Sequence, residues 1–280
     1  GLVGTLQNAK AKDCYFAGSL DGRTHAKASL CLGGVIGACT LGEIENCFST
    51  GTIIASGSDA VVGGVVGSLS GAVLKNSYST GLITSPSSTR SGGLAGWVRA
   101  NSSTGKQSTV ESCYTATSLD AETSNYDPQN NSREIIGLVA EGSTPTIKDI
   151  YYDKQLTNYR STKYGVATSK LVSASGVEGF DASIWTFAKD QYPMIKSLSD
   201  NEAAKTSVSS IIMTEGNSLG KLAANAELHA FGNTEFFLYN NGQLAKEGHF
   251  SGIDGNVLKI KEEFGTDTLV VKNGNLGYVY

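Results

Sequence analysis

The sequence predicts an all-β protein: a parallel β-solenoid of about five coils over residues 1–198, followed by a small Ig-like β-sandwich over 208–280. Three observations predict this. The stretch Gly34–Ile53 recurs as Gly64–Ile83 with the same landmarks, and a repeat of roughly 20–50 residues is typical of solenoids and related arrays. The chain holds 34 Gly and only 4 Pro, which favours short strands and many turns. After residue 207 the pattern changes to short alternating apolar runs divided by turn residues, as in a sandwich.

The repeat is aligned on one small residue, here called the anchor. The anchors are spaced at 33, 30, 36 and 37 residues, and they are Cys14, Cys47, Ser77, Cys113 and a degenerate Ile150. A glycine pair opens each of the first four units, for example Gly34 with Gly37, and the fifth has Gly137 with Ala140. The fourth unit carries an insertion around 101–108. Residues 1–20 fit the same frame, so we expect the first coil to begin at Gly1.

Each position around the anchor has its own chemistry. Short polar residues directly before the anchor are typical of a corner. An aromatic column follows the anchor: Tyr15, Phe48, Tyr78, Tyr114 and Tyr151. Two residues before the anchor the charge alternates from coil to coil: Lys12, Glu45, Lys75, Glu111 and Lys148. Stacked coils lie about 4.8 Å apart, so the alternation would relieve like-charge repulsion. The alternative is chance alternation on a solvated face.

The five cysteines do not form a zinc pattern. Three of them (Cys14, Cys47 and Cys113) are anchors, and we expect these to be reduced and buried as small apolar side chains. A disulfide between Cys31 and Cys39 is the alternative for the other two. We expect no metal site and no cofactor, because the three histidines are scattered: His25, His229 and His249.

Charge and hydropathy exclude two classes of partner. The net charge is −4, so we expect no nucleic acid. No apolar run approaches the roughly 20 residues that span a bilayer. No signal peptide is visible at Gly1, and we expect the sequence to be a mature or trimmed piece of a longer one. We expect a monomer.

The chain is divided into a solenoid with a C-terminal cap (1–198), a polar linker (199–207) and the sandwich (208–280). Within the cap we expect a short helix between residues 168 and 184. Its expected core residues are Trp185, Phe187, Tyr192 and Met194. In the sandwich, turns are expected at Asn217, Asn240–Gly242, Asp254–Gly255 and Asn273–Gly274, and an Asn–Gly pair between strands predicts a hairpin.

The repeat resembles the GLUG-motif family, whose pattern is roughly GGLVG…G-x-I-x-N-[CS]-[YF]-[AS]-T-G-x-[IV]. Residues 33–53 and 63–83 match it nearly position for position, and 1–20 and 92–119 match in part. The likeness extends to about residue 198, including Trp185 and the Tyr192–Pro193 pair. It implies a secreted or surface protein of bacteria, often adhesin-like. Residues 236–248 (FFLYNNGQLAKEG) resemble the small sandwich modules that end many secreted Bacteroidetes proteins.

Three functions remain open. The first is a non-catalytic surface adhesion or binding module for a glycan or a host matrix protein, with Trp97, Tyr126 and Tyr159 as candidate contacts. The alternatives without a binding role are a position in the core for Trp97 and incidental loop positions for the two tyrosines. The second is a polysaccharide-degrading β-helix enzyme, although the carboxylates of Glu43, Glu45 and Glu111 fall in ladder columns beside lysines, which indicates charge balancing rather than a catalytic pair. The third is a stalk or spacer. We expect no catalytic residues, and binding through loops that include 120–134.

Overall fold

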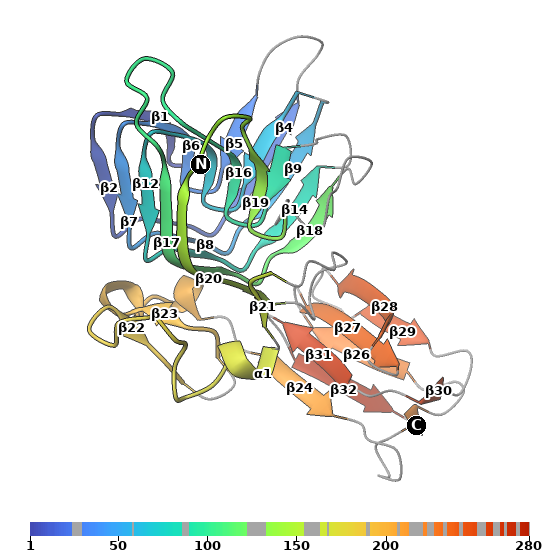
Figure 1. The fold of residues 1–280 in the computed structure, drawn as a ribbon. Helices are drawn as coiled ribbons and strands as arrows, with labels where there is room; N and C mark the ends of the chain where they lie inside the picture. The colour runs from blue at the N-terminus through green and yellow to red at the C-terminus, as the bar shows by residue number, and fades with distance from the viewer. Residues whose placement is uncertain are drawn as a thin grey trace. The chain divides into compact units, whose positions relative to one another are not determined.

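The computed structural model describes most of the repeat region and the strands that follow it. The described residues are 1–23, 30–57, 59–85, 90–121, 133–153, 163–166, 168–188, 191–205, 208–212, 221–222, 227–231, 234–240, 243–250, 256–259, 264–265, 268–272 and 275–279. They fall into two compact units (Figure 1). The first contains Gly1–Leu171, Ser175–Phe187 and Pro193–Ala204, and the second contains Val172–Ala174, Ala188–Tyr192 and Lys205–Tyr280. The linker at 199–207 stays a prediction.

The first unit is a parallel β-solenoid, as predicted, and its successive turns add parallel strands to four sheets. The first sheet consists of β1 (Val3–Gln7), β6 (Ile36–Thr40), β11 (Val66–Ser70), β16 (Ala95–Arg99) and β19 (Ile136–Val139). The third consists of β4 (Ser19–Arg23), β9 (Thr52–Ser56), β14 (Leu82–Ser85) and β18 (Ser118–Ala121). The fourth consists of β5 (Cys31–Gly33), β10 (Val61–Gly63) and β15 (Arg90–Gly92).

The second sheet carries the anchor and its neighbours on both sides of a corner. Before the corner lie β2 (Lys10–Lys12), β7 (Glu43–Glu45) and β12 (Val73–Lys75), and after it lie β3 (Tyr15–Phe16), β8 (Phe48–Ser49) and β13 (Tyr78–Ser79). In the later turns β17 (Thr109–Thr115) and β20 (Thr146–Asp153) run through the corner, and β21 (Gly165–Val166) pairs with β20. The stack has about four turns, and β19 and β20 form a partial fifth layer. About five coils were expected, so the fifth is present only in part.

The strand registers confirm the predicted columns. Lys12 pairs with Glu45, Glu45 with Lys75, and Lys75 with Glu111, so the alternating charges are neighbours. The aromatic rings of Tyr15, Phe48, Tyr78 and Tyr114 are stacked with centroids 5.0 Å apart and planes within 9° of parallel. This distance is close to the spacing between neighbouring strands of a sheet, so one ring per coil makes a continuous stack.

The corner before each anchor is left-handed. All five corner residues have φ between 48° and 54°: Asp13, Asn46, Asn76, Ser112 and Asp149. Asn and Asp tolerate this conformation better than other non-glycine residues, which explains the short polar side chains at this position.

The anchor side chain bridges this corner. In the third coil the Ser77 hydroxyl donates to the Lys75 carbonyl at 2.8 Å, and it accepts from the Cys47 backbone N–H at 3.1 Å. The Cys47 thiol likewise donates to the carbonyl of Glu45 at 3.2 Å, and the Cys113 thiol to the carbonyl of Glu111 at 3.1 Å. An anchor must therefore be small and able both to donate and to accept, which Cys and Ser satisfy.

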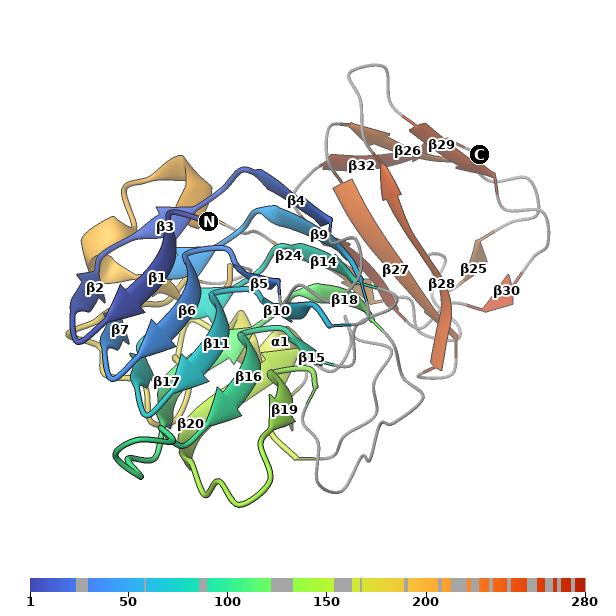
Figure 2. The ribbon, with the colours of Figure 1, turned by 90° about the horizontal axis from the view of Figure 1, so that it is seen from above.

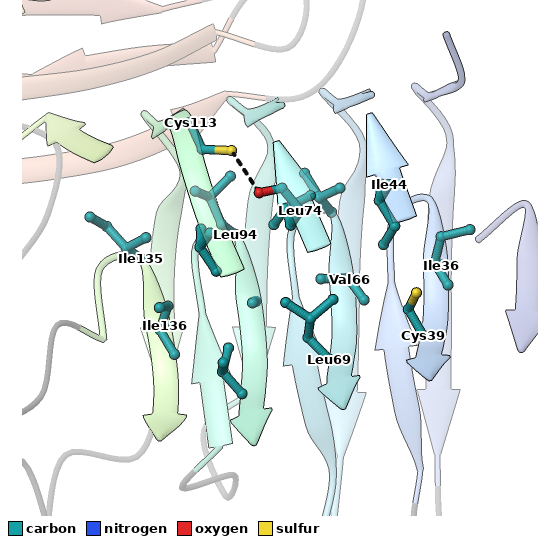
Figure 3. Close-up of a cluster of buried hydrophobic side chains, with 14 of the residues drawn as sticks. Ile36, Cys39, Ile44, Val66, Leu69, Leu74, Leu94, Cys113, Ile135 and Ile136 are labelled. Carbon is teal, nitrogen blue, oxygen red and sulfur yellow. Dashed lines mark hydrogen bonds between the residues drawn. The ribbon is translucent and has the colours of Figure 1, made fainter. Parts of the chain in front are cut away.

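The interior of the solenoid is apolar and tightly packed. The main cluster joins the first and second sheets (Figure 3), where Ile36, Leu69, Leu74 and Val98 are fully buried. A second cluster contains Leu32, Val62 and Ile83, from the third and fourth sheets. A side chain at Gly34 would lie 2.3 Å from the Ser49 hydroxyl, so this position holds only glycine. The same contact recurs between Gly64 and Ser79, which explains why glycine and Ser recur together in the repeat.

The anchor cysteines are free, as are Cys31 and Cys39. Cys47 and Cys113 are fully buried, as predicted, and burial raises the pKa of both thiols to about 12. Cys14 is only half-buried, which corrects the expectation for this anchor, because it lies between β2 and β3, which are edge strands of the described sheet.

The two ends of the stack differ in burial. In the last layer Ile135, Ile136 and Ile150 are at most 3% exposed. In the first coil Leu2 is 54% exposed and Tyr15 37% exposed. Strands β1 to β4 are edge strands of their sheets (Figure 2).

Residues Val177–Phe187 and Pro193–Ala204, here called the flank segment, run along the outside of the second sheet. They include β22 (Trp185–Thr186), β23 (Met194–Ile195) and the 3-10 helices η1 (Lys196–Leu198) and η2 (Glu202–Ala204), and the short helix α1 (Thr168–Leu171) precedes them. Trp185, Tyr192 and Met194 are buried as expected, whereas Phe187 is half-buried. The Trp185 ring packs 6.0 Å from that of Tyr78 and 5.9 Å from that of Tyr114.

Hydrogen bonds attach the flank segment to successive coils. Side chains of the solenoid donate to its carbonyls: Tyr151 to Glu178 (3.0 Å), Tyr114 to Pro193 (2.7 Å) and Tyr78 to Ala204 (3.2 Å). The Ser197 hydroxyl donates to the carboxylate of Asp13 in the first coil at 2.7 Å. The cap was expected to close the end of the stack, but this part of it covers the aromatic column from the side.

The second unit contains antiparallel strands. One sheet has the order β24 (Val208–Ile212), β31 (Thr268–Lys272), β27 (Thr234–Asn240) and β28 (Gln243–Phe250). Another has the order β29 (Asn256–Lys259), β26 (Glu227–Phe231) and β32 (Asn275–Val279), and β25 (Lys221–Leu222) pairs with β30 (Phe264–Gly265). The Ig-like sandwich stays a prediction.

One of the predicted hairpins in this unit is present. Strands β27 and β28 pair across Asn241–Gly242, with Asn240 opposite Gln243. The hairpin predicted at Asn273–Gly274 was wrong, because β31 and β32 belong to different sheets. Asn217 lies outside the described residues.

Candidate functional site

Trp97 lies on the outward side of the first sheet. Its neighbour Val98 is buried in the core, and side chains alternate along a strand, so Trp97 and Arg99 share the opposite side of β16. Along the stack Trp97 is in register with Ser68 and Leu138. The ring is half-buried, so the core role considered for it does not apply.

Two guanidinium groups pack against the Trp97 ring. The Cζ atom of Arg99 lies 4.3 Å from the ring centroid, and that of Arg90 lies 5.4 Å from it. Such contacts hold a cation against the negative face of an aromatic ring. Arg90 also donates to the Asp59 carbonyl at 2.8 Å. The set of Arg90, Trp97 and Arg99 is here called the arginine–tryptophan cluster.

The cluster has unused hydrogen-bonding capacity. Trp97 Nε1 and Arg99 Nε are buried and have no hydrogen-bond partner among the described residues. Among the described residues, Arg99 forms no ion pair with a carboxylate. Arg23, by contrast, forms an ion pair with Asp21 at 2.9 Å. A guanidinium placed over a ring can still donate its remaining N–H groups to a carboxylate or sulfate. The cluster is therefore chemically suited to an anionic group.

Sequence reasoning found Trp97 but missed both arginines. The signal for Arg99 was present in the sequence, since a residue two positions along a strand shares the same face. Arg90 comes from β15, and only the fold brings it to the ring. Tyr126 and Tyr159, the other two predicted contacts, and most of the loop 120–134 lie outside the described residues.

A second polar surface lies on the charge column. Lys75 contacts Glu43 at 2.7 Å and Glu45 at 3.8 Å, and Lys10 lies 3.6 Å from Glu43 and also pairs with Glu45. The hydrogen bond from Lys75 lowers the pKa of Glu43, and Glu45 and Glu43 raise that of Lys10. The ion pairs are partly diagonal, since Lys10 rather than Lys12 holds Glu45. Further along, Lys148 lies 3.5 Å from Glu111.

No group of metal-ligating side chains occurs among the described residues, and the helices found there are too short to cross a membrane.

Residues 28–54 match the model of the GLUG motif. The matched stretch covers the second coil, from before β5 to within β9. No curated protein and no solved structure matches the chain. The geometry explains the motif's most specific positions, because Asn46 takes the left-handed corner and Cys47 bridges it. At these positions the GLUG motif thus encodes a stackable coil.

Proposed function

We propose that this chain is a non-catalytic bacterial surface module that binds an acidic glycan through the arginine–tryptophan cluster. The observation that carries the proposal is the pair of guanidinium groups on the half-buried Trp97 ring, one of them with no carboxylate partner in the described structure. Uronate and sulfate groups are planar or multidentate anions that guanidinium recognises well. The GLUG motif and the solenoid fit a repeat protein of the bacterial surface, and this fit supports an extracellular setting.

The carboxylates on the charge column support a non-catalytic role. Hydrolysis of a glycosidic bond generally uses two carboxyl groups, one of which must stay protonated near neutral pH. Glu43 contacts two lysines, which lower its pKa, and Glu111 has Lys148 beside it. An ionised carboxylate in an ion pair is a poor general acid. A stalk or spacer is the second candidate, favoured by the uninterrupted ladder of coils.

The test uses the full chain on an array of acidic glycans, neutral glycans and matrix proteins. We expect binding to uronate- or sulfate-bearing glycans that weakens as the salt concentration rises. Arg99→Ala should weaken it at least about tenfold, since a hydrogen bond to a charged group contributes roughly 1.5–3 kcal/mol. Arg23→Ala is the matched control, because Arg23 is already paired and should leave binding unchanged.

The outcomes separate the three functions. Equal binding by the wild type and by Arg99→Ala would show that the binding site lies elsewhere on the chain. An array blank for every ligand favours the stalk. Release of reducing or unsaturated sugar ends from the same panel would overturn the non-catalytic reading.

A further inference from the structure

Two serine hydroxyls beside the arginine–tryptophan cluster have no partner. Ser68 and Ser70 belong to β11, the strand next to β16 in the first sheet (Figure 2). Leu69 between them belongs to the core, so both serines point to the outward side of the sheet. Each is only 4% exposed, yet neither hydroxyl forms a hydrogen bond with another described residue. Buried polar groups in native proteins are nearly always paired, so two unpaired ones on one side of a strand point to a ligand.

The strand register places the two serines against the cluster. Ser68 pairs with Trp97, and Ser70 pairs with Arg99. Neighbouring strands lie about 4.8 Å apart and alternate residues of one strand about 6.6 Å apart, so the four Cα atoms form a small rectangle of about this size. These four residues are here called the donor patch. Its two other members also have unused donors, since Trp97 Nε1 and Arg99 Nε are buried without a partner among the described residues.

The chemistry of the donor patch is one-sided. Indole and guanidinium groups only donate hydrogen bonds, and a serine hydroxyl can donate as well as accept. None of the residues in register with the patch on this side of the sheet carries a carboxylate; they are Thr5, Ala38 and Leu138 in the Trp97 row, and Gln7 and Thr40 in the Arg99 row. The patch therefore suits a ligand group that is anionic and accepts several hydrogen bonds.

The directions of the donors distinguish two kinds of anion. The four side chains come from two strands and from two positions along each strand, so they approach a shared acceptor from different directions. A carboxylate has two oxygens, which accept best near the plane of the group. A sulfate or phosphate ester has three terminal oxygens that point in three directions. The ester can therefore accept from more of the four side chains at once than a carboxylate can.

We propose that the donor patch binds a tetrahedral oxyanion ester of a glycan, sulfate or phosphate, in preference to a carboxylate. The Ser68 and Ser70 hydroxyls and Trp97 Nε1 donate to the ester oxygens, and Arg99 supplies the positive charge and a further donor. This inference rests on the glycan binding proposed above, and it names the chemical group that the site recognises.

The test compares three ligands with the same backbone. Cello-oligosaccharides that carry sulfate, phosphate or carboxymethyl groups at matched charge are titrated into the full chain by calorimetry at one salt concentration. We expect at least one of the two esters to bind about tenfold or more tightly than the carboxymethyl ligand, because hydrogen bonds to a charged acceptor are the strong ones. The ester that binds more tightly identifies the source of the oxyanion.

Variants of the two serines locate the preference. Ser68→Ala combined with Ser70→Ala should reduce the ratio of ester affinity to carboxymethyl affinity at least about fivefold. Ser70→Thr keeps a hydroxyl in a row that already contains Thr40, so it should retain the ratio. Ser19→Ala, on β4 of the third sheet, is the matched control and should not change the ratio. The Tm of each variant is measured beside it, so that a loss of binding is not confused with unfolding.

The outcomes separate this inference from the proposed function. Equal affinity for all three ligands that still depends on Arg99 would keep glycan binding and overturn the preference for an oxyanion ester. A preference for the esters that survives the double serine substitution would overturn the assignment to the donor patch. If none of the three ligands binds, the glycan-binding function itself is wrong, and this inference fails with it.

Discussion

Removal of the Ser77 hydroxyl tests the role of the anchor column directly. The side chain is fully buried and makes two hydrogen bonds, one to the Lys75 carbonyl and one from the Cys47 N–H. Ser77→Ala removes both at once, and the small change in volume leaves no room for a compensating water. The Cys47 amide would then be buried without this partner, whereas the Lys75 carbonyl still accepts from the backbone N–H of Asn46 at 3.3 Å.

The expected magnitude follows from the unpaired amide. A buried polar group left without a partner costs about 1–3 kcal/mol. Because only the Cys47 amide loses its partner, we expect Ser77→Ala to lower the free energy of unfolding by about 1–3 kcal/mol. Ser77→Cys is the matched control, because cysteine occupies this column at Cys47 and Cys113 and can both donate and accept. It should cost less than about 1 kcal/mol.

Urea unfolding followed by tryptophan fluorescence is the assay. Both tryptophans of the chain, Trp97 and Trp185, belong to the first unit, so the signal reports on the solenoid alone. The midpoint should fall for Ser77→Ala with an unchanged m-value. If Ser77→Ala and Ser77→Cys unfold at the same urea concentration, the hydrogen bonds of the anchor column do not stabilise the fold and the reasoning is refuted.

Three further predictions follow. Under native conditions a thiol reagent should modify half-buried Cys14 well before Cys47. Cys47 is fully buried and its pKa is raised to about 12, so its thiol stays protonated and inaccessible. Equal labelling rates would show that the reagent reaches the anchor cysteines inside the stack. Lys75 lowers the pKa of Glu43, so the contribution of this ion pair to stability is present above the pKa of the unfolded chain, near 4.5, and is lost as the pH falls through the pKa of the folded protein. Glu43→Gln should therefore flatten the decline in Tm below about pH 4.5. An unchanged slope would contradict the ion pair. Limited proteolysis within 199–207 should leave two stable fragments, whereas loss of structure in the C-terminal one would show a shared core.

Much of the solenoid could be predicted because its rules are local and recur. The left-handed corner at Asn46, the anchor at Cys47 and the ring at Phe48 follow one another in the sequence, so one aligned repeat fixes the register of every coil. The alternation of the charge column was predicted correctly. The diagonal pairing of Lys10 with Glu45 was not predicted, because a long lysine side chain can reach either of two nearby carboxylates.

What the sequence hid depends on contacts between distant segments. The cap was expected at the end of the stack, yet Trp185 lies against Tyr78 and Tyr114 on its side. An apolar column that faces outward looks the same in sequence as one that faces inward until its cover is known. The candidate site shows the same limit, since Arg90 reaches Trp97 only through the turn between β15 and β16. In the C-terminal unit, Asn273–Gly274 looked like a hairpin but joins two sheets, because turn chemistry does not specify which strands pair.

The flank segment has a consequence for how the protein assembles. A simple array of repeats is coupled only between neighbours, so its ends can fray and it can grow from any point. Here Ser197 reaches Asp13 and Ala204 reaches Tyr78, which ties the earliest coil to residues made much later. The stacked rings of Phe48 and Tyr78 would stay uncovered on a nascent chain until those residues leave the ribosome. The flank segment therefore couples distant coils, so the solenoid should fold and unfold in one cooperative transition. Its contacts join residues far apart in the sequence, which should make the last step of folding slow.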